Sequence, residues 1–333
     1  MTLSRSRIAL CGGAAATLLV LVFTPQLLGG RVSGALVALR GADPGWLTLG
    51  AVGFIGGFCC TVGAWRSALS AAGGSICAKQ ASARLGIGSL VNAFAPAKLG
   101  DAVKIALCAR AVEGPDRLWT TGGVYAALAA ARSLCLAALL VVASATGALP
   151  LWPVFVLCSL VAVIGCAAAF SGRLRNHPRI AHLLGALAAL ERSPRAVASV
   201  LGWTAAMVLM RLSATVAVAA AIQLPHPFLA ALLILPALDV AAAFPVTPGG
   251  MGVGSGAVAV ALAGRGIGAS QALGVGIAIQ ALETAVAIGA GSAGALYLAG
   301  PGTAARRWSM RVAFVGAAAS AAALLGAAVL DVL

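Results

Sequence analysis

The stretch FPVTPGGMGVGSG, residues 244–256, decides how the whole chain is interpreted. It contains two prolines and five glycines. Both residue types disfavour an α-helix, because proline lacks a backbone N–H and glycine loses the most conformational freedom on folding. Apolar sequence nevertheless flanks the stretch on both sides. A helix break placed between apolar segments is therefore the feature that needs an explanation.

The composition is that of a membrane protein. Of the 333 residues, 61% are hydrophobic and only 9% are charged, and the mean hydropathy is +1.04. A soluble domain could not cover its surface with so few polar residues. Apolar runs of about 20 residues fit transmembrane helices, whereas a membrane-spanning barrel would show alternating segments of roughly ten residues. The sequence thus predicts an all-α polytopic membrane protein.

Seven apolar runs are long enough to be full spans, and two more are interrupted by Pro and Gly. The predicted spans are 8–28, 46–65, 119–146, 150–170, 197–221, 270–298 and 312–330. The interrupted regions are 85–111 and 228–263. Non-helical backbone inside a membrane survives only where protein or a wet cavity shields it. We therefore expect each interrupted region to form a re-entrant hairpin.

The basic residues indicate the orientation of the spans. With the N-terminus in the cytoplasm, the basic connections also lie there, provided that residues 228–263 enter and leave the membrane on one side. These connections are 66–117, 173–195 and 306–311. Outside the spans, only Arg31, Arg40 and Arg265 then face outward. The net charge of +14 therefore fits the positive-inside pattern, and no nucleic-acid partner is expected.

A second break has the same spacing as the first. In FAPAKLGDAVK, residues 94–104, the run Pro96 to Gly100 reads Pro-x-x-Leu-Gly, and Pro248 to Gly252 reads Pro-x-x-Met-Gly. Each break directly precedes a strong span, and the predicted topology gives the two breaks opposite orientations. Such paired breaks indicate an inverted repeat with a site near the midplane. The predicted halves are residues 1–172 and 173–333.

Both breaks suit an anionic ligand. A half-helix that starts near Gly249 or Gly250 directs unpaired N–H groups and a positive dipole end into the membrane, and the glycines let a ligand approach the backbone. Lys98 and Lys104 add positive charge at the other break. A lipid phosphate is the expected anion. The sequence shows no Cys or His pairing at metal-ligand spacing, so neither a metal nor a cofactor is expected.

Four charged residues lie within the predicted embedded regions. Arg132 and Arg211 fall in the middle of full spans, and Asp239 and Glu283 lie in the other embedded regions. Intramembrane charges are costly and face partners in the protein interior. Two readings stay open: a pair of structural ion pairs, or a polar cavity in which the arginines hold phosphate and the acids pair with an amine or with each other.

The candidate lipid-headgroup residues come from the two breaks and from the embedded charges. They are Pro96, Lys98, Gly100, Asp101, Lys104, Arg132, Arg211, Asp239, Thr247, Pro248, Gly249, Gly250, Gly252 and Glu283.

At its two breaks the chain resembles the transmembrane, flippase-like region of the lysylphosphatidylglycerol synthases. The first family motif reads Asn92, Pro96, Lys98, Gly100, Asp101 and Lys104 here. The second reads Pro245, Thr247, Pro248, Gly249, Gly250, Met251 and Gly252. The resemblance implies a multi-pass protein of the bacterial plasma (inner) membrane that binds or moves lipids. It implies no aminoacyl transfer, because that reaction belongs to a soluble C-terminal domain that is not expected here.

The chain departs from the family pattern at three positions. The Glu-Arg-x-x-Asp set of relatives retains only Arg132, and Ser255 stands where an acid usually follows the glycines. Around Gln280 an arginine of relatives is missing, while Glu283 is added nearby. A site built from ion pairs would therefore be rewired.

Two functions from different classes follow. The chain either flips an anionic or modified lipid between leaflets, or it is a non-transporting scaffold for a separate lipid-modifying enzyme. The sequence contains no P-loop, so ATP is not expected to drive movement directly. An intramembrane enzyme is disfavoured, because no metal set and no nucleophile–base pair is evident.

Overall fold

The structure is a computed structural model that describes five parts of the chain. These parts are residues 40–95, 98–114, 116–147, 193–243 and 252–299. Within them every regular element is a helix, which confirms the predicted all-α fold. The predicted spans 8–28, 150–170 and 312–330 lie outside the described residues. So do five of the candidate site residues, namely Pro96, Thr247, Pro248, Gly249 and Gly250.

Four of the described helices are long and apolar enough to cross a membrane. They are α2 (Pro44–Ala71), α5 (Arg117–Ala145), α8 (Pro194–Ala221) and α11 (Ala269–Leu298). The shortest have 28 residues and are about 42 Å long at 1.5 Å per residue, which exceeds the roughly 30 Å of a hydrocarbon core. Each coincides with a span predicted from the sequence and extends it at one end or both.

The two interrupted regions form pairs of shorter helices. The first pair is α3 (Ala78–Phe94) and α4 (Leu99–Cys108), followed by the 3-10 turn η1 (Ala109–Ala111). The second pair is α9 (Pro227–Ala243) and α10 (Val253–Ala263). The helix breaks therefore lie where the prolines and glycines predicted them. Re-entry of each pair into a membrane stays a prediction.

The order of helix lengths in the described residues occurs twice. A 28-residue helix, a 17-residue helix, a 10-residue helix and a 29-residue helix make up α2 to α5. From α8 to α11 the lengths are 28, 17, 11 and 30 residues. The helix starts also correspond, because α2 and α8 each begin with a proline directly after a polar N-cap residue.

Both short helices that follow a break begin at a residue with positive φ. Lys98, the N-cap residue of α4, has a φ of 54°, and Gly252, the N-cap residue of α10, has a φ of 84°. For Lys98 this left-handed conformation costs about 1–2 kcal/mol. The expected start of the second half-helix near Gly249 or Gly250 is thus replaced by a start at Val253.

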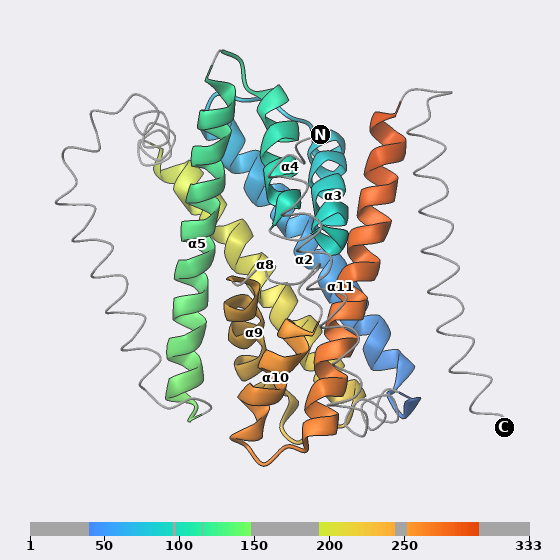
Figure 1. Cartoon of the computed structure of the whole chain (residues 1–333). Coiled ribbons are helices and arrows are strands. Elements are labelled where there is room, and N and C mark those ends of the chain that lie inside the picture. The colour runs from blue at the N-terminus through green and yellow to red at the C-terminus, as the bar shows by residue number, and fades with distance from the viewer. Residues whose placement is uncertain (1–39, 96–97, 115, 148–192, 244–251, 300–333) are drawn as a thin grey trace, which may run out of the picture.

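Two of the hydrophobic clusters join helices that lie towards opposite ends of the molecule, α3 and α4 at one end and α9 and α10 at the other (Figure 1). At one end, α3 and α4 pack with the end of α2 and the starts of α5 and α8 around Leu69, Leu85 and Val124. At the other end, α9 and α10 pack with the end of α8 and the start of α11 around Ile234 and Leu262. The two short-helix pairs therefore approach the middle of the molecule from opposite sides.

Small residues let several helices pack at very short range. A Cβ atom on Gly53 of α2 would lie 2.9 Å from the Cβ atom of Ala214 on α8, so these two helices cross nearly backbone to backbone. α3 and α11 are equally close, because a Cβ atom on Gly291 would lie 2.9 Å from the carbonyl oxygen of Gly86. Close packing of small residues is a main source of helix association in lipid.

Candidate functional site

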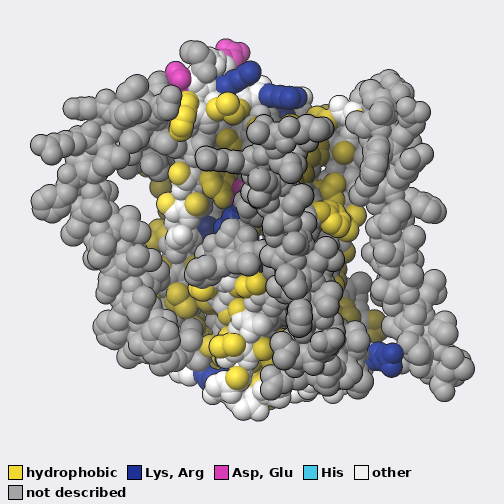
Figure 2. Space-filling view, viewed as in Figure 1, with side chains coloured by type: hydrophobic (Ala, Val, Ile, Leu, Met, Phe, Trp, Pro, Cys, Tyr) yellow, Lys and Arg dark blue, Asp and Glu magenta, His cyan; other side chains and the backbone are white. Residues whose placement is uncertain are grey.

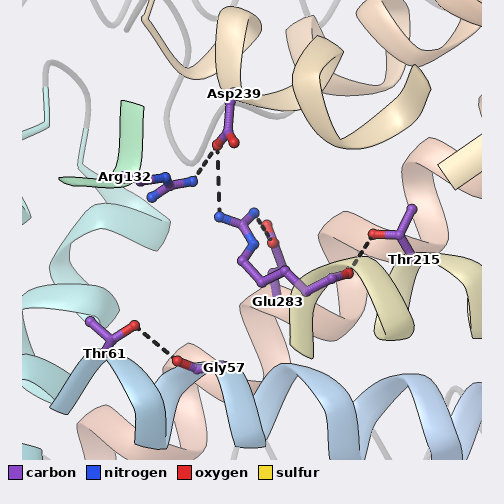
Figure 3. A network of polar contacts seen from close by, with 7 residues as sticks. Gly57, Thr61, Arg132, Thr215, Asp239 and Glu283 are labelled. Carbon is purple, nitrogen blue, oxygen red and sulfur yellow. Dashed lines mark hydrogen bonds and ion pairs between the residues drawn. The ribbon is translucent and has the colours of Figure 1, made fainter. Parts of the chain in front are cut away.

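The four embedded charges predicted from the sequence meet in one network (Figure 3). Arg132 of α5 donates through Nη2 to Oδ1 of Asp239 on α9. Arg211 of α8 lies beside the same oxygen, with its Nη1 atom 3.8 Å away, and its Nη2 atom donates to Oε1 of Glu283 on α11 at 2.5 Å. The structure thus joins both ion pairs through Arg211 into a chain of alternating sign.

Each charge of the network comes from a different helix, and all four helices contribute apolar surface elsewhere. The inner pair is well covered, since the side chain of Asp239 is 14% exposed and that of Arg211 is 19% exposed. The outer pair is more open, with Arg132 at 37% and Glu283 at 36%. Two arginines and two acids balance one another, which lowers the cost of holding charge among apolar helices.

Two atoms of the network have no hydrogen-bond partner within the described part of the chain. They are the buried Oδ2 of Asp239 and the buried Nε of Arg211. Unpaired buried polar atoms are rare in folded proteins and are often completed by water, an ion or a ligand. Arg132 also has donors to spare, because a guanidinium group carries five N–H donors and the Nη2 group is the one that bonds to Asp239. The network can therefore accept an additional polar group.

Asp101 from the first break is the centre of a second polar cluster. Its Oδ1 accepts from Asn92 Nδ2 at 2.8 Å and from Lys104 Nζ at 3.0 Å, and its Oδ2 accepts from the Tyr125 hydroxyl at 2.9 Å. These contacts join α3, α4 and α5. Asp101 and Lys104, both predicted to face a headgroup, are thus paired with each other and with the neighbouring helices.

Tyr125 is a site residue that the sequence analysis did not identify, although its position relative to Arg132 indicates it. It precedes Arg132 by seven residues, and seven residues make about two turns of an α-helix. Both side chains therefore project from the same face of α5, one into each polar cluster. The spacing of two helical turns between this tyrosine and the arginine therefore indicates that both face the protein interior.

Two glycines in these stretches, Gly100 and Gly254, let neighbouring helices pack closely. A Cβ atom on Gly100 would overlap the carbonyl oxygen of Gly88 and the amide group of Asn92, so α4 lies directly on α3. On the other side of the molecule, a Cβ atom on Gly254 would be 2.6 Å from Nε2 of Gln280, which brings α10 against α11. The predicted site residue Gly252 begins α10, where a Cβ atom would meet no neighbour within 4 Å.

The structure therefore sorts the described candidate residues into three groups. Arg132, Arg211, Asp239 and Glu283 form the charge network, while Asp101 and Lys104 form the polar cluster on α4. Lys98, Gly100 and Gly252 shape the two helix starts. Among the described residues, no group of three or more His, Cys, Asp or Glu side chains could hold a metal ion.

One comparison with known proteins found a match. A family model described as the lysylphosphatidylglycerol synthase TM region matches residues 9–291. This range includes both breaks and all four charges of the network. No curated protein was found to match the chain.

Proposed function

The chain belongs to the lysylphosphatidylglycerol synthase TM region family, a family of membrane proteins involved in lipid handling, and from this premise we propose that it binds a lipid headgroup at the charge network and moves the lipid between leaflets. The lipid is an anionic or modified one. Binding and translocation, rather than catalysis, is the proposed activity.

The charge network is the observation that carries the proposal. It lies among helices long enough to cross a membrane, and its central members, Asp239 and Arg211, each retain an unpaired buried atom. The more open guanidinium group of Arg132 has the planar fork that suits bidentate binding of phosphate. Asp239 Oδ2 can accept from an amine or hydroxyl group of the same headgroup. A headgroup would thereby complete the network.

The repeated order of helices supports translocation over simple binding. We interpret α2–α5 and α8–α11 as the cores of two inverted repeats, within the halves 1–172 and 173–333. In such transporters the site lies near the midplane, and the repeats rock around it. The two short-helix pairs approach the middle from opposite ends, as this arrangement requires.

A second candidate function is a scaffold for a separate lipid-modifying enzyme. The internal charge balance of the network favours it, because two arginines and two acids can stabilise one another without a ligand. In that case the network joins four helices and no lipid crosses. The two functions differ in whether a headgroup reaches Arg132.

A leaflet-exchange assay separates the two functions. The full chain is reconstituted in liposomes that carry fluorescent phosphatidylglycerol or phosphatidylethanolamine, and exchange is measured by dithionite quenching. We expect exchange above protein-free vesicles, and a loss of at least tenfold in Arg132→Gln. Arg117→Gln, the same change at the exposed start of α5 and outside the network, should exchange normally. Equal rates for the wild-type protein and empty vesicles with both lipids would contradict translocation and favour the scaffold.

We further propose that the protein lies in the bacterial plasma membrane with its N-terminus in the cytoplasm. Most described Lys and Arg residues outside the network lie at the end where α3 begins, for example Arg66, Arg110 and Arg117. The opposite end holds Arg40 and Arg265. By the positive-inside pattern, the end that holds α3 and α4 faces the cytoplasm.

A further inference from the structure

A long groove lies on the outside of the helix assembly, between α2, α3 and α11. Its volume is about 610 Å³, within the range of small-molecule sites. The lining is almost wholly apolar and includes Phe58 of α2 and Gly289 of α11. Two polar side chains of α3, Lys79 and Ser82, line it as well, together with Tyr297 of α11.

The packing of small residues explains why this groove exists. Gly291 and Gly294 bring α11 into backbone contact with α3. The neighbouring face of α11 carries further small residues, and at Gly289 a Cβ atom would meet nothing within 4 Å. α2 bounds the other side through Ile55 and Phe58. The groove is thus open space along α11, bounded by close helix contacts.

The length of the groove matches an acyl chain rather than a small solute. Its lining residues on α11 run from Leu282 to Tyr297, which spans about 22 Å at 1.5 Å per residue. This is a large part of the roughly 30 Å hydrocarbon thickness of a bilayer. One end therefore lies at Leu282, the residue before Glu283 in the sequence, and the other lies at the end where α3 begins.

That outer end carries positive charge. Lys79 is exposed in the first turn of α3, and its ammonium group has no carboxylate partner within the described residues. The N-cap residue Cys77 makes no side-chain hydrogen bond to the helix, so the positive end of the helix dipole adds to the charge of Lys79. Tyr297, which is 53% exposed, offers a ring and hydroxyl of the kind found at membrane interfaces.

We propose that this groove is a docking site for one glycerophospholipid, with an acyl chain along α11 and the phosphate at Lys79. The apolar length selects a chain, and the charge at its outer end selects a phosphate. This site is separate from the charge network and does not depend on translocation. Its deep end lies at Leu282, one residue before Glu283, so a lipid held there has its chain end on the same turn of α11 as the network and its headgroup at the membrane surface.

Photocrosslinking tests the groove with a defined lipid. The full chain is placed in nanodiscs that contain phosphatidylglycerol with a diazirine in one acyl chain, and labelled peptides are mapped by mass spectrometry. We expect labelling concentrated on residues 282–297 of α11 and on residues 51–58 of α2. Labelling spread evenly over other lipid-facing positions, such as Leu209 of α8, would show bulk lipid only and overturn the proposal.

Two matched glycines provide the blocking variant and its control. Gly289→Leu places a side chain in the groove, whereas Gly202→Leu makes the same change on α8, where a Cβ atom also has free space. We expect Gly289→Leu to reduce α11 labelling at least fivefold and Gly202→Leu to leave it unchanged. Equal labelling in the two variants would contradict the site. Both variants are checked for a monodisperse elution profile.

Charge variants test the phosphate end and keep this proposal apart from the first. Lys79→Glu should reduce groove labelling severalfold, while Lys79→Arg should retain it. Arg132→Gln should leave groove labelling intact, even if it abolishes exchange. A photoreactive amino acid at position 289 should form lipid adducts. A cross-link from that position to a second copy, or to another segment of the chain, would show a protein occupant and overturn the proposal.

Discussion

Asp239 is the residue on which the charge network depends. One of its oxygens contacts both Arg132 and Arg211, so a single carboxylate stands between two guanidinium groups from different helices. Without that carboxylate, two positive charges would face each other among apolar helices. Arg132 stands at the edge of the network, and its removal leaves Asp239 still paired with Arg211. Loss of Asp239 should therefore destabilise the protein more than loss of Arg132.

This difference predicts unequal effects of two conservative substitutions. Asp239→Asn should lower the free energy of unfolding by about 3–5 kcal/mol, the usual cost of leaving buried charge without its partner. Arg132→Gln should lower the free energy of unfolding by clearly less, because Asp239 remains paired with Arg211. The measurement is the melting temperature of detergent-solubilised protein, followed by fluorescence-detected gel filtration. The double variant should recover part of the loss, and equal melting temperatures for the two single variants would refute the central position of Asp239.

Tyr125 gives the second prediction at this scale. Its hydroxyl donates to Asp101 Oδ2, so Tyr125→Phe leaves a partly buried carboxylate oxygen without that hydrogen bond. We expect a loss of about 1–3 kcal/mol in stability, since an unsatisfied acceptor costs roughly that much. Tyr297→Phe is the matched control, because that side chain is exposed. If both variants melt at the same temperature as the wild-type protein, the hydrogen bond does not stabilise the fold.

At the scale of helices, the sequence predicted most of what the structure describes. The spans 46–65, 119–146, 197–221 and 270–298 were recognisable because about 20 consecutive apolar residues leave few alternatives to a membrane helix. The breaks were recognisable because Pro and Gly disfavour helix. The start of α10 at Val253 could not be recognised, since it depends on Gly252 adopting a positive φ rather than on composition.

Contacts between distant helices set the limit of sequence reasoning. Arg132 and Asp239 were each identifiable as embedded charges, but their pairing across 107 positions depends on how α5 meets α9. The sequence left two separate ion pairs and a shared cavity as alternatives. The link through Arg211 follows from helix packing, which hydrophobic periodicity does not encode. The groove along α11 could not be predicted from the sequence either, because three different helices form its walls.

The crossing of α2 and α8 yields a prediction about helix packing. Gly53→Leu should push the helices apart, because even a Cβ atom there would be 2.9 Å from Ala214 Cβ. Overpacking of this kind costs about 1–3 kcal/mol or more, so the melting temperature in detergent should fall. Gly202→Leu, in open space on α8, should leave it unchanged or slightly raised by better helix propensity. If the Gly53→Leu protein is as stable as the control, close contact between α2 and α8 at Gly53 is not needed for stability.

For the whole molecule, the main structural fact is that the two short-helix pairs belong to opposite ends. The backbone N–H of Ser75, before α3, bonds to the carbonyl of Ala111, after α4, so this pair starts and finishes at one end. The start of α9 and the end of α10 both belong to the hydrophobic cluster at the other end, through Ala230 and Leu262. Figure 2 shows hydrophobic side chains over much of the described part of one face, with Lys and Arg side chains at both ends and a few in the middle.

This arrangement predicts the side of the membrane on which four positions lie. Single cysteines are introduced in a Cys-free background at four positions. Ala78 is the first residue of α3 and Glu113 follows η1, whereas Phe228 and Ala263 lie at the start of α9 and the end of α10. A membrane-impermeant maleimide should label the second pair in intact cells and the first pair only after permeabilisation. Each pair should behave alike, because a re-entrant pair of helices returns to the side from which it came. If Ala78 and Glu113 were labelled from opposite sides, α3 and α4 would together cross the membrane. The proposed inverted repeat, and with it a midplane site between two facing breaks, would then be wrong, because α3 and α4 would no longer be the counterpart of α9 and α10.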